Sequence, residues 1–180
     1  MIGAIHRRMR ERENGERGFT LIELMVVVMI IAILVGIAIP AFLGARKRAQ
    51  DTAAKSNLRN ALSSATAIFS DDQTYLDSAD MVTALTAEEP SLLFEINTSD
   101  SGTAKEISVL TDASTALGTT NDMVVLASAS KSGKCFFLRH VNTPDMLGIS
   151  GTSSAETATN TACSADDAPD PALAADWTSL

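Results

Sequence analysis

The chain is 180 residues long and carries a formal net charge of −8, from 14 Lys and Arg against 22 Asp and Glu. Because this balance is acidic, a basic nucleic-acid-binding surface is not expected. Aromatic residues make up only 4% of the chain, against 46% hydrophobic residues overall, which excludes a large aromatic core. Two cysteines are too few for a scaffold held together by several disulfides.

Charge and hydrophobicity are distributed unevenly along the chain. Residues 1–18 contain five Arg and three Glu, whereas residues 24–45 carry no charge, and 18 of the 20 residues from Leu24 to Leu43 are apolar. Twenty-two helical residues would extend roughly 33 Å, which is enough to cross a hydrocarbon core of about 30 Å. The sequence therefore predicts a membrane-spanning helix.

The apolar pattern continues beyond this segment with a helical period. Leu58, Leu62, Ala65 and Phe69 are spaced by four, three and four residues, and no Gly or Pro interrupts residues 46–70. We expect one helix over about residues 20–70, apolar all round in its first half and amphipathic in its second. The polar run Asp71-Asp72-Gln73 is the predicted stop.

The remaining residues predict a small antiparallel sheet of three or four strands. A short helix is expected at about 79–87, capped by Asp77 or Ser78 and ended before Pro90. The Ser/Thr/Ala/Asp-rich segment from Gly151 is typical of disorder, with Cys163 and Trp177 as its only anchors. The predicted strands are Leu92–Ile96 and Glu106–Leu110, which flank a turn at Asp100-Ser101-Gly102, and Met123–Ser128 and Cys135–Val141, which flank a hairpin loop at Ser130-Lys131-Ser132-Gly133.

Three features coincide in the segment RGFTLIE at residues 17–23. Gly18 ends the charged leader, Phe19 begins the apolar run, and Glu23 lies inside that run, where a charged carboxylate is costly and requires a partner. If the leader were removed after Gly18, Phe19 would carry a free amino group. In a helix this amine would lie on the same face as Glu23, so Glu23 could pair with it or with the amine of a displaced neighbour. The alternative is that Glu23 reaches the lipid headgroups.

The segment GFTLIELMVVVMIIAILVGIAIPAF resembles the N-terminus of type IV pilins and the related pseudopilins. The resemblance covers Gly18 to about Phe42 and continues in style through LGARKRAQDTAAKSNLRNAL. It implies that a prepilin peptidase cuts between Gly18 and Phe19 and N-methylates Phe19. It also implies that Glu23 neutralises the Phe19 amine of a neighbouring subunit during filament assembly.

The resemblance further implies an α+β pilin fold, in which a long N-terminal helix packs on a small antiparallel sheet. The expected parts are a leader at 1–18, a transmembrane and filament-core half-helix at 19–45, an amphipathic half-helix at 46–71, and a globular α+β region with a Ser/Thr/Ala-rich C-terminal tail at 72–180. Before assembly the chain would be a single-pass protein of the cytoplasmic (inner) membrane. Its partners would be the prepilin peptidase, the pilus assembly machinery and further copies of itself in a helical filament on the cell surface.

Other functions remain open at this point. Within the family, the chain could be a pseudopilin of a type II secretion or DNA-uptake machine. From a different class, it could be a membrane-anchored binding domain that does not polymerise. A secretory signal peptide and a plain single-span anchor fit less well, because the apolar run is too long for the first and neither explains Glu23.

Pro40 is predicted to disturb the helix. It removes the hydrogen bond to the carbonyl of Gly36, itself a weak helix former, at a cost of about 3 kcal/mol. We expect a bend or a local loss of helix between the two residues. In the pilin family this stretch is similar and can unwind when the subunit enters the filament.

The only cysteines, Cys135 and Cys163, both lie in the part expected outside the membrane, where oxidising conditions favour a disulfide. Pilins resemble this arrangement, with a disulfide that closes a C-terminal loop. Unpaired thiols are the alternative.

No enzyme, cofactor or metal site is predicted. His140 is isolated on a strand, no nucleophile has a base beside it, and no phosphate-binding loop is present. The residues Asp166, Asp167 and Asp170 could bind Ca²⁺ but are more typical of a solvated tail. Asn97-Thr98-Ser99 fits an N-glycosylation pattern, and the Ser/Thr runs at 152–161 could be O-glycosylated.

Overall fold

The computed structural model describes residues 18–96, 102–111, 122–142, 151–157, 163–169 and 178–179. It divides at Gly44 into an N-terminal unit and a second unit, Ala45–Leu180, which we call the head. The described elements are α2 (Leu21–Asp72), α3 (Ser78–Glu88), β1 (Leu93–Ile96), β2 (Glu106–Thr111), β3 (Met123–Ala129), β4 (Cys135–Val141), β5 (Gly151–Thr157), a 3₁₀ turn (Ala165–Asp167) and β6 (Thr178–Ser179).

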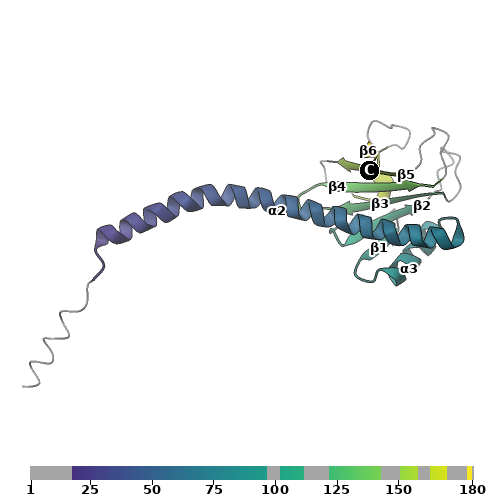
Figure 1. Cartoon of the computed structure of the whole chain (residues 1–180), viewed down its shortest axis with the longest axis horizontal. Coiled ribbons are helices and arrows are strands. Elements are labelled where there is room, and N and C mark those ends of the chain that lie inside the picture. Colours follow the sequence, from purple (N-terminus) through teal and green to yellow (C-terminus); the bar gives the residue numbers. More distant parts are fainter. Residues whose placement is uncertain are drawn as a thin grey trace, which may run out of the picture. The chain divides into compact units, whose positions relative to one another are not determined.

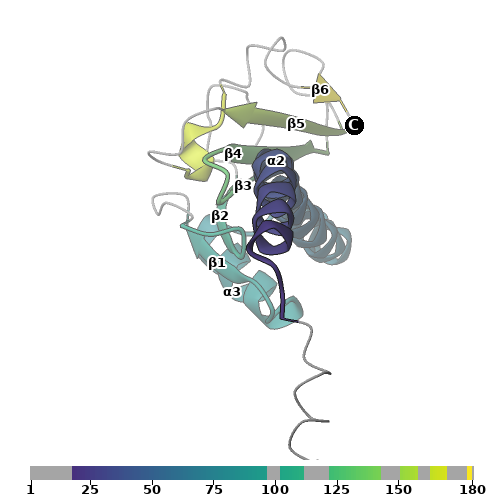
Figure 2. The ribbon, with the colours of Figure 1, turned by 90° about the vertical axis from the view of Figure 1, so that its left-hand side faces the viewer.

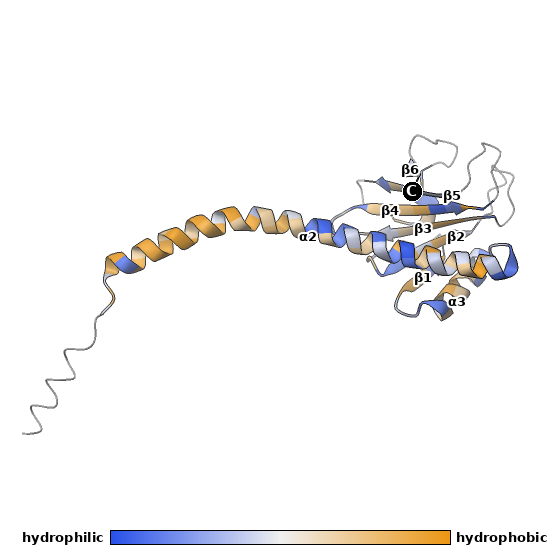
Figure 3. Ribbon diagram, viewed as in Figure 1, coloured by the Kyte–Doolittle hydropathy of each residue, from blue (hydrophilic) through white to orange (hydrophobic). Residues whose placement is uncertain are grey.

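Helix α2 confirms the predicted long N-terminal helix within two residues at each end. Its first half is apolar all round, and every side chain from 18 to 49 is exposed to solvent (Figures 1 and 3). Mean hydropathy reaches 3.1 over an 18-residue window of this helix, and none of that window is buried. By length and composition, α2 can cross a membrane.

The second half of α2 is amphipathic, as the residue spacing predicts. Its buried side chains recur every three or four positions and face the sheet, whereas polar side chains occupy the other face. The helix ends where Gln73 adopts a left-handed conformation (φ 57°) and its amide donates to the carbonyl of Phe69 at 2.7 Å. The buried residues are Ala54, Leu58, Ala61, Leu62, Ala65 and Phe69.

The sheet of the head has six strands in the order β1-β2-β3-β4-β5-β6 (Figure 2). The prediction of three or four strands was therefore too low. All neighbouring strands are antiparallel except β1 and β2, which are parallel.

The antiparallel arrangement expected for β1 and β2 is wrong, because the two strands pair in parallel. In the parallel register Phe94 lies opposite Ile107, so that both apolar side chains enter the same core. A hairpin centred on the predicted turn would instead place Phe94 beside Ser108. The turn residues Asp100 and Ser101 lie outside the described residues, whereas Gly102 lies just before β2.

Two clusters of buried side chains lie on opposite faces of the sheet. On one face α2 and α3 pack against strand residues such as Val109, Leu126 and Phe136. On the other, Val125 and Phe137 pack with the segment around Cys163. Because both faces of β3 and β4 are covered, these strands lack the clean alternation of a half-exposed sheet.

Strand β5 is the largest departure from the sequence prediction. Residues 151–157 were expected to be disordered, yet all seven pair with β4 in antiparallel register. The pairing partner is a buried, Phe-rich strand that needs a neighbour for its backbone groups, and this requirement outweighs the weak local preference of a Ser/Thr-rich segment. Of the other anchors, Cys163 is buried and Trp177 lies outside the described residues.

Candidate functional site

The junction between the leader and α2 is extended and exposed. Gly18, Phe19 and Thr20 precede the first helical residue, Leu21. The side chain of Phe19 is 84% exposed. Beyond its chain neighbours, a side chain at position 18 would meet no atom of the described residues within 4 Å. The Gly18–Phe19 peptide bond is thus open to an external enzyme, and the helical geometry expected for Phe19 does not extend to it.

The carboxylate of Glu23 is held at the start of α2 by Thr20. The backbone amide and the hydroxyl of Thr20 both donate to Glu23 Oε2, at 2.9 and 2.8 Å. The amide of Glu23 donates in return to the Thr20 hydroxyl oxygen at 3.2 Å. This reciprocal pattern is a capping box, which satisfies helix-start amides that have no intrahelical partner. Within the described residues, Glu23 Oε1 has no hydrogen-bond partner.

Gly36 and Pro40 lie inside α2, which remains helical through both positions. The local loss of helix that the sequence allows is therefore absent in this subunit, while a bend at Pro40 stays a prediction. Apart from the adjacent helix backbone, a side chain at Gly36 would meet no atom of the described residues within 4 Å. Packing within the subunit does not explain this glycine.

Part of the chain is similar to known proteins. Residues 14–39 match the family model described as the prokaryotic N-terminal methylation motif. The chain is 46% identical over 66 residues to the type IV major pilin protein PilA of Myxococcus xanthus, and 51% identical over 49 residues to the type IV wide pilus major component PilA4 of Thermus thermophilus. By its N-terminal segment, this chain is similar to type IV pilins.

The similarity to these pilins is confined to part of each protein. The matches cover 37% and 27% of this chain, and 30% and 37% of the M. xanthus and T. thermophilus proteins. No solved structure matches the chain significantly. The family model covers the junction and the first part of α2 at residues 14–39, whereas the head is described from its own structure.

Thr20 is the functional residue of the pilin segment that the sequence argument missed. The pattern Thr-Leu-Ile-Glu at 20–23 is itself a capping-box signature. A charged partner was expected for Glu23, whereas the hydroxyl and backbone amide of Thr20 are neutral.

Cys135 and Cys163 form the predicted disulfide. Both cysteines are buried, with Cα atoms 5.6 Å apart, and they tie the segment that contains the 3₁₀ turn to β4. A closed loop of this size stabilises the folded state by about 3–4 kcal/mol in the chain-entropy model.

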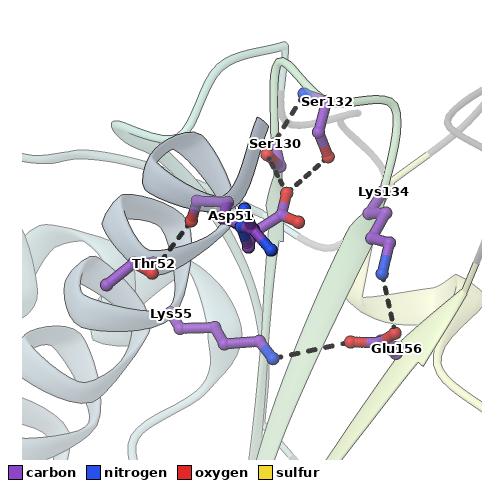
Figure 4. A network of polar contacts seen from close by, with 8 residues as sticks. Asp51, Thr52, Lys55, Ser130, Ser132, Lys134 and Glu156 are labelled. Carbon is purple, nitrogen blue, oxygen red and sulfur yellow. Dashed lines mark hydrogen bonds and ion pairs between the residues drawn. The ribbon is translucent and has the colours of Figure 1, made fainter. Parts of the chain in front are cut away.

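A polar network joins α2 to the turn between β3 and β4 (Figure 4). Asp51 accepts hydrogen bonds from the hydroxyls of Ser130, at 2.7 Å, and Ser132. Burial by itself raises the pKa of Asp51, but these hydrogen bonds, together with the charges of Lys134 and Lys55, outweigh burial and hold the pKa below its usual value. The hydroxyls of the turn therefore stabilise the charged form of Asp51.

Beside this network, Glu156 on β5 lies between two lysines. It pairs with Lys134 at 3.0 Å and with Lys55 of α2 at 3.5 Å (Figure 4). The hydrogen bond from Lys134 is the main cause that lowers the pKa of Glu156 and raises that of Lys134. Because all three side chains are about half exposed, we expect these pairs to contribute little stability.

The other residues singled out in the sequence have structural roles where they are described. His140 Nδ1 lies 2.9 Å from the hydroxyl of Thr152 on the neighbouring strand, and burial lowers its pKa. Asp167 accepts hydrogen bonds from the amide and hydroxyl of Ser164, which caps the 3₁₀ turn, and Asp166 is exposed. Asp170, the Asn97-Thr98-Ser99 pattern, residues 158–161 of the Ser/Thr-rich run and the leader residues 1–17 lie outside the described residues.

Proposed function

We propose that this chain is the precursor of a structural subunit of a type IV pilus-like filament. The observation that carries the proposal is the pilin segment itself: an exposed peptide bond, an apolar helix and a carboxylate at the first turn of that helix. The two matched relatives are named as major pilus components, which favours a surface pilus over a pseudopilin.

Processing would occur at the exposed junction. A prepilin peptidase would cut between Gly18 and Phe19 and N-methylate the new terminus. Both residues precede α2, so cleavage would not require the helix to unwind. The capping box involves only Thr20 and Glu23 and would survive cleavage.

Assembly would use α2 twice. Before assembly its apolar half would hold the subunit in the membrane, and in the filament the same surface would pack against copies of itself. Glu23 would retain its cap through Oε2, leaving Oε1 to accept the Phe19 ammonium of a neighbour. The charge of each group would then be neutralised at a depth where an unpaired charge is costly.

Substitution of Glu23 tests the pairing role. Glu23→Ala is expected to reduce filament yield at least about tenfold, because a neighbouring ammonium would lose its charged partner. Glu23→Gln should fail to a similar degree, since the amide can still accept from Thr20 but carries no charge. Filaments would be counted by electron microscopy, with the chain measured in the membrane fraction.

Asp166→Ala provides the matched control, because Asp166 is an exposed carboxylate on the head. It should leave filament yield unchanged, and all three variants should insert into the membrane normally. Normal filaments in Glu23→Gln would refute the charge-pairing role and leave only capping.

A further inference from the structure

The charges of the head are segregated along the chain. Residues 46–59 of α2 contain five Lys or Arg and one carboxylate, Asp51. The next 45 residues, from Asn60 to Ala104, contain no Lys or Arg. We call the first set the basic segment (Arg46, Lys47, Arg48, Lys55 and Arg59) and the exposed carboxylates that follow the acidic end (Asp71, Asp72, Asp77, Asp80 and Glu88).

Part of the basic segment borders a groove of about 390 Å³ between α2 and strands β4–β6. Lys55, Leu58 and Arg59 line it from the helix. Arg48, Lys55 and Arg59 are spaced by seven and four residues and therefore share one flank of α2. The facing wall and floor include Phe136, Leu138, Ser154, Glu156 and Thr178.

The groove has a surplus of positive charge. Its one carboxylate, Glu156, is already paired with Lys55 and Lys134. Within the described residues, Arg48 and Arg59 form no ion pair, and neither does any carboxylate of the acidic end. The molecule thus presents a basic surface and an acidic surface, and apart from Lys55 their charged side chains have no ion-pair partner in the described part of the chain.

Two residues of the acidic end, Asp71 and Asp72, lie on α2 too far from the basic segment to meet it within one copy. Lys47 and Asp72 are 25 positions apart on the continuous helix α2, which corresponds to about 38 Å. Even Arg59 and Asp71 are separated by about 18 Å along the helix axis. A second copy placed in register would bring like charges together, whereas a copy shifted along the axis would bring opposite charges together.

We propose that the acidic end of one copy docks on the basic segment and groove of a copy shifted along the helix axis. Because the two surfaces are different parts of the molecule, the contact is heterologous and propagates without closing, as a filament requires. The inference rests on the proposed filament function and adds to it the charged contact that sets the stagger between subunits.

An anionic membrane surface fits the observations less well. Headgroups at the end of the apolar segment would meet Arg46, Lys47 and Arg48, but Lys55 and Arg59 lie about 14–20 Å further along the helix. The groove at Lys55 and Arg59 therefore requires a partner that extends beyond the membrane surface.

Carbodiimide cross-linking of assembled filaments tests the contact. The reagent joins a lysine amine directly to a touching carboxylate, and Arg59→Lys adds such an amine to the groove while keeping its charge. We expect mass spectrometry to find links from Lys47 or position 59 to Asp71, Asp72, Asp77 or Asp80. Links from either position to Asp71 or Asp72 must join different copies, because those pairs are too far apart on one helix.

The Lys55–Glu156 pair is the internal control, since its link forms within one head. Filaments that give this link but none from the basic segment to the acidic end would overturn the inference while leaving the filament function intact. If the wild-type chain formed no filaments at all, the proposed function would fail and this contact with it.

Charge reversal tests the same contact by rescue. Arg48→Glu with Arg59→Glu, and separately Asp71→Lys with Asp72→Lys, should each lower filament yield about tenfold through like-charge repulsion, and combining all four should restore most of it. Lys131→Glu, an exposed site on the β3–β4 turn, is the control and should have no effect. Failure of the combination to rescue, or loss of the reversed variants from the membrane fraction, would overturn the contact between copies.

Discussion

The hydroxyl of Thr20 and the carboxylate of Glu23 satisfy each other's hydrogen bonds at the first turn of α2. The role expected for Glu23 concerned charge alone. The structure adds a neutral role that operates within one subunit, in which a single oxygen of the carboxylate caps the helix. Because Oε2 caps the helix and Oε1 does not, the side chain of Glu23 can stabilise the first turn of α2 and still accept a hydrogen bond from an amine.

Replacement of Thr20 separates the cap from the charge. Thr20→Ala should weaken the start of α2 by about 0.5–2 kcal/mol, whereas Thr20→Ser keeps the hydroxyl and should change little. Hydrogen exchange of the amides at 21–24 in the detergent-solubilised chain would measure the effect. Equal exchange in both variants would show that the capping box does not hold the helix end.

His140 predicts a pH dependence of head stability. Burial lowers its pKa from 6.5, so the unfolded chain binds a proton more readily than the folded one. The contribution of neutral His140 to the free energy of unfolding is therefore present at neutral pH and is lost as the pH falls below about 6.5. The urea midpoint of the solubilised chain should therefore decrease between about pH 7.5 and 5, and His140→Gln should flatten this slope. If His140→Gln had the same dependence of the urea midpoint on pH as the wild type, His140 would not be the group responsible.

At the scale of elements, the sequence pattern predicted features that depend on neighbouring residues, such as the buried face of a helix. The four-and-three spacing of Leu58, Leu62, Ala65 and Phe69 located the buried face of α2 because a helix repeats within a few residues. Strand partners are chosen across long sequence separations, so the parallel β1–β2 pair was missed. Strand β5 was missed for the same reason, because its order comes from its pairing with β4 and its own composition does not predict it.

The link between α2 and the β3–β4 turn offers a test at this scale. Asp51→Ala would leave the hydroxyls of Ser130 and Ser132 without their shared acceptor, at an expected cost of about 1–3 kcal/mol. Asp51→Asn should cost less, because the amide oxygen can still accept. Chemical unfolding at neutral pH would compare the variants. Wild-type stability in Asp51→Ala would show that the turn holds its position on α2 without this bond.

For the whole molecule, the average composition describes neither of its two parts, the apolar half of α2 and the head. The 46% hydrophobic content combines a helix whose apolar half is entirely exposed in one subunit with a head that has a buried core and one disulfide, Cys135–Cys163. The net charge of −8 likewise combines a basic leader and basic segment with residues 60–180, which carry 4 Lys or Arg against 17 Asp or Glu. In the proposed filament, the membrane or another copy would cover the surface that each imbalance leaves.

The N-terminus of the assembled subunit tests this account most directly. Filaments would be sheared from cells that produce the full chain, and the intact mass and terminal peptide of the subunit would be measured by mass spectrometry. The account predicts a chain that begins at Phe19 and carries one methyl group on its α-amino nitrogen. Filaments whose subunits retain residues 1–18, or begin at any other residue, would contradict it.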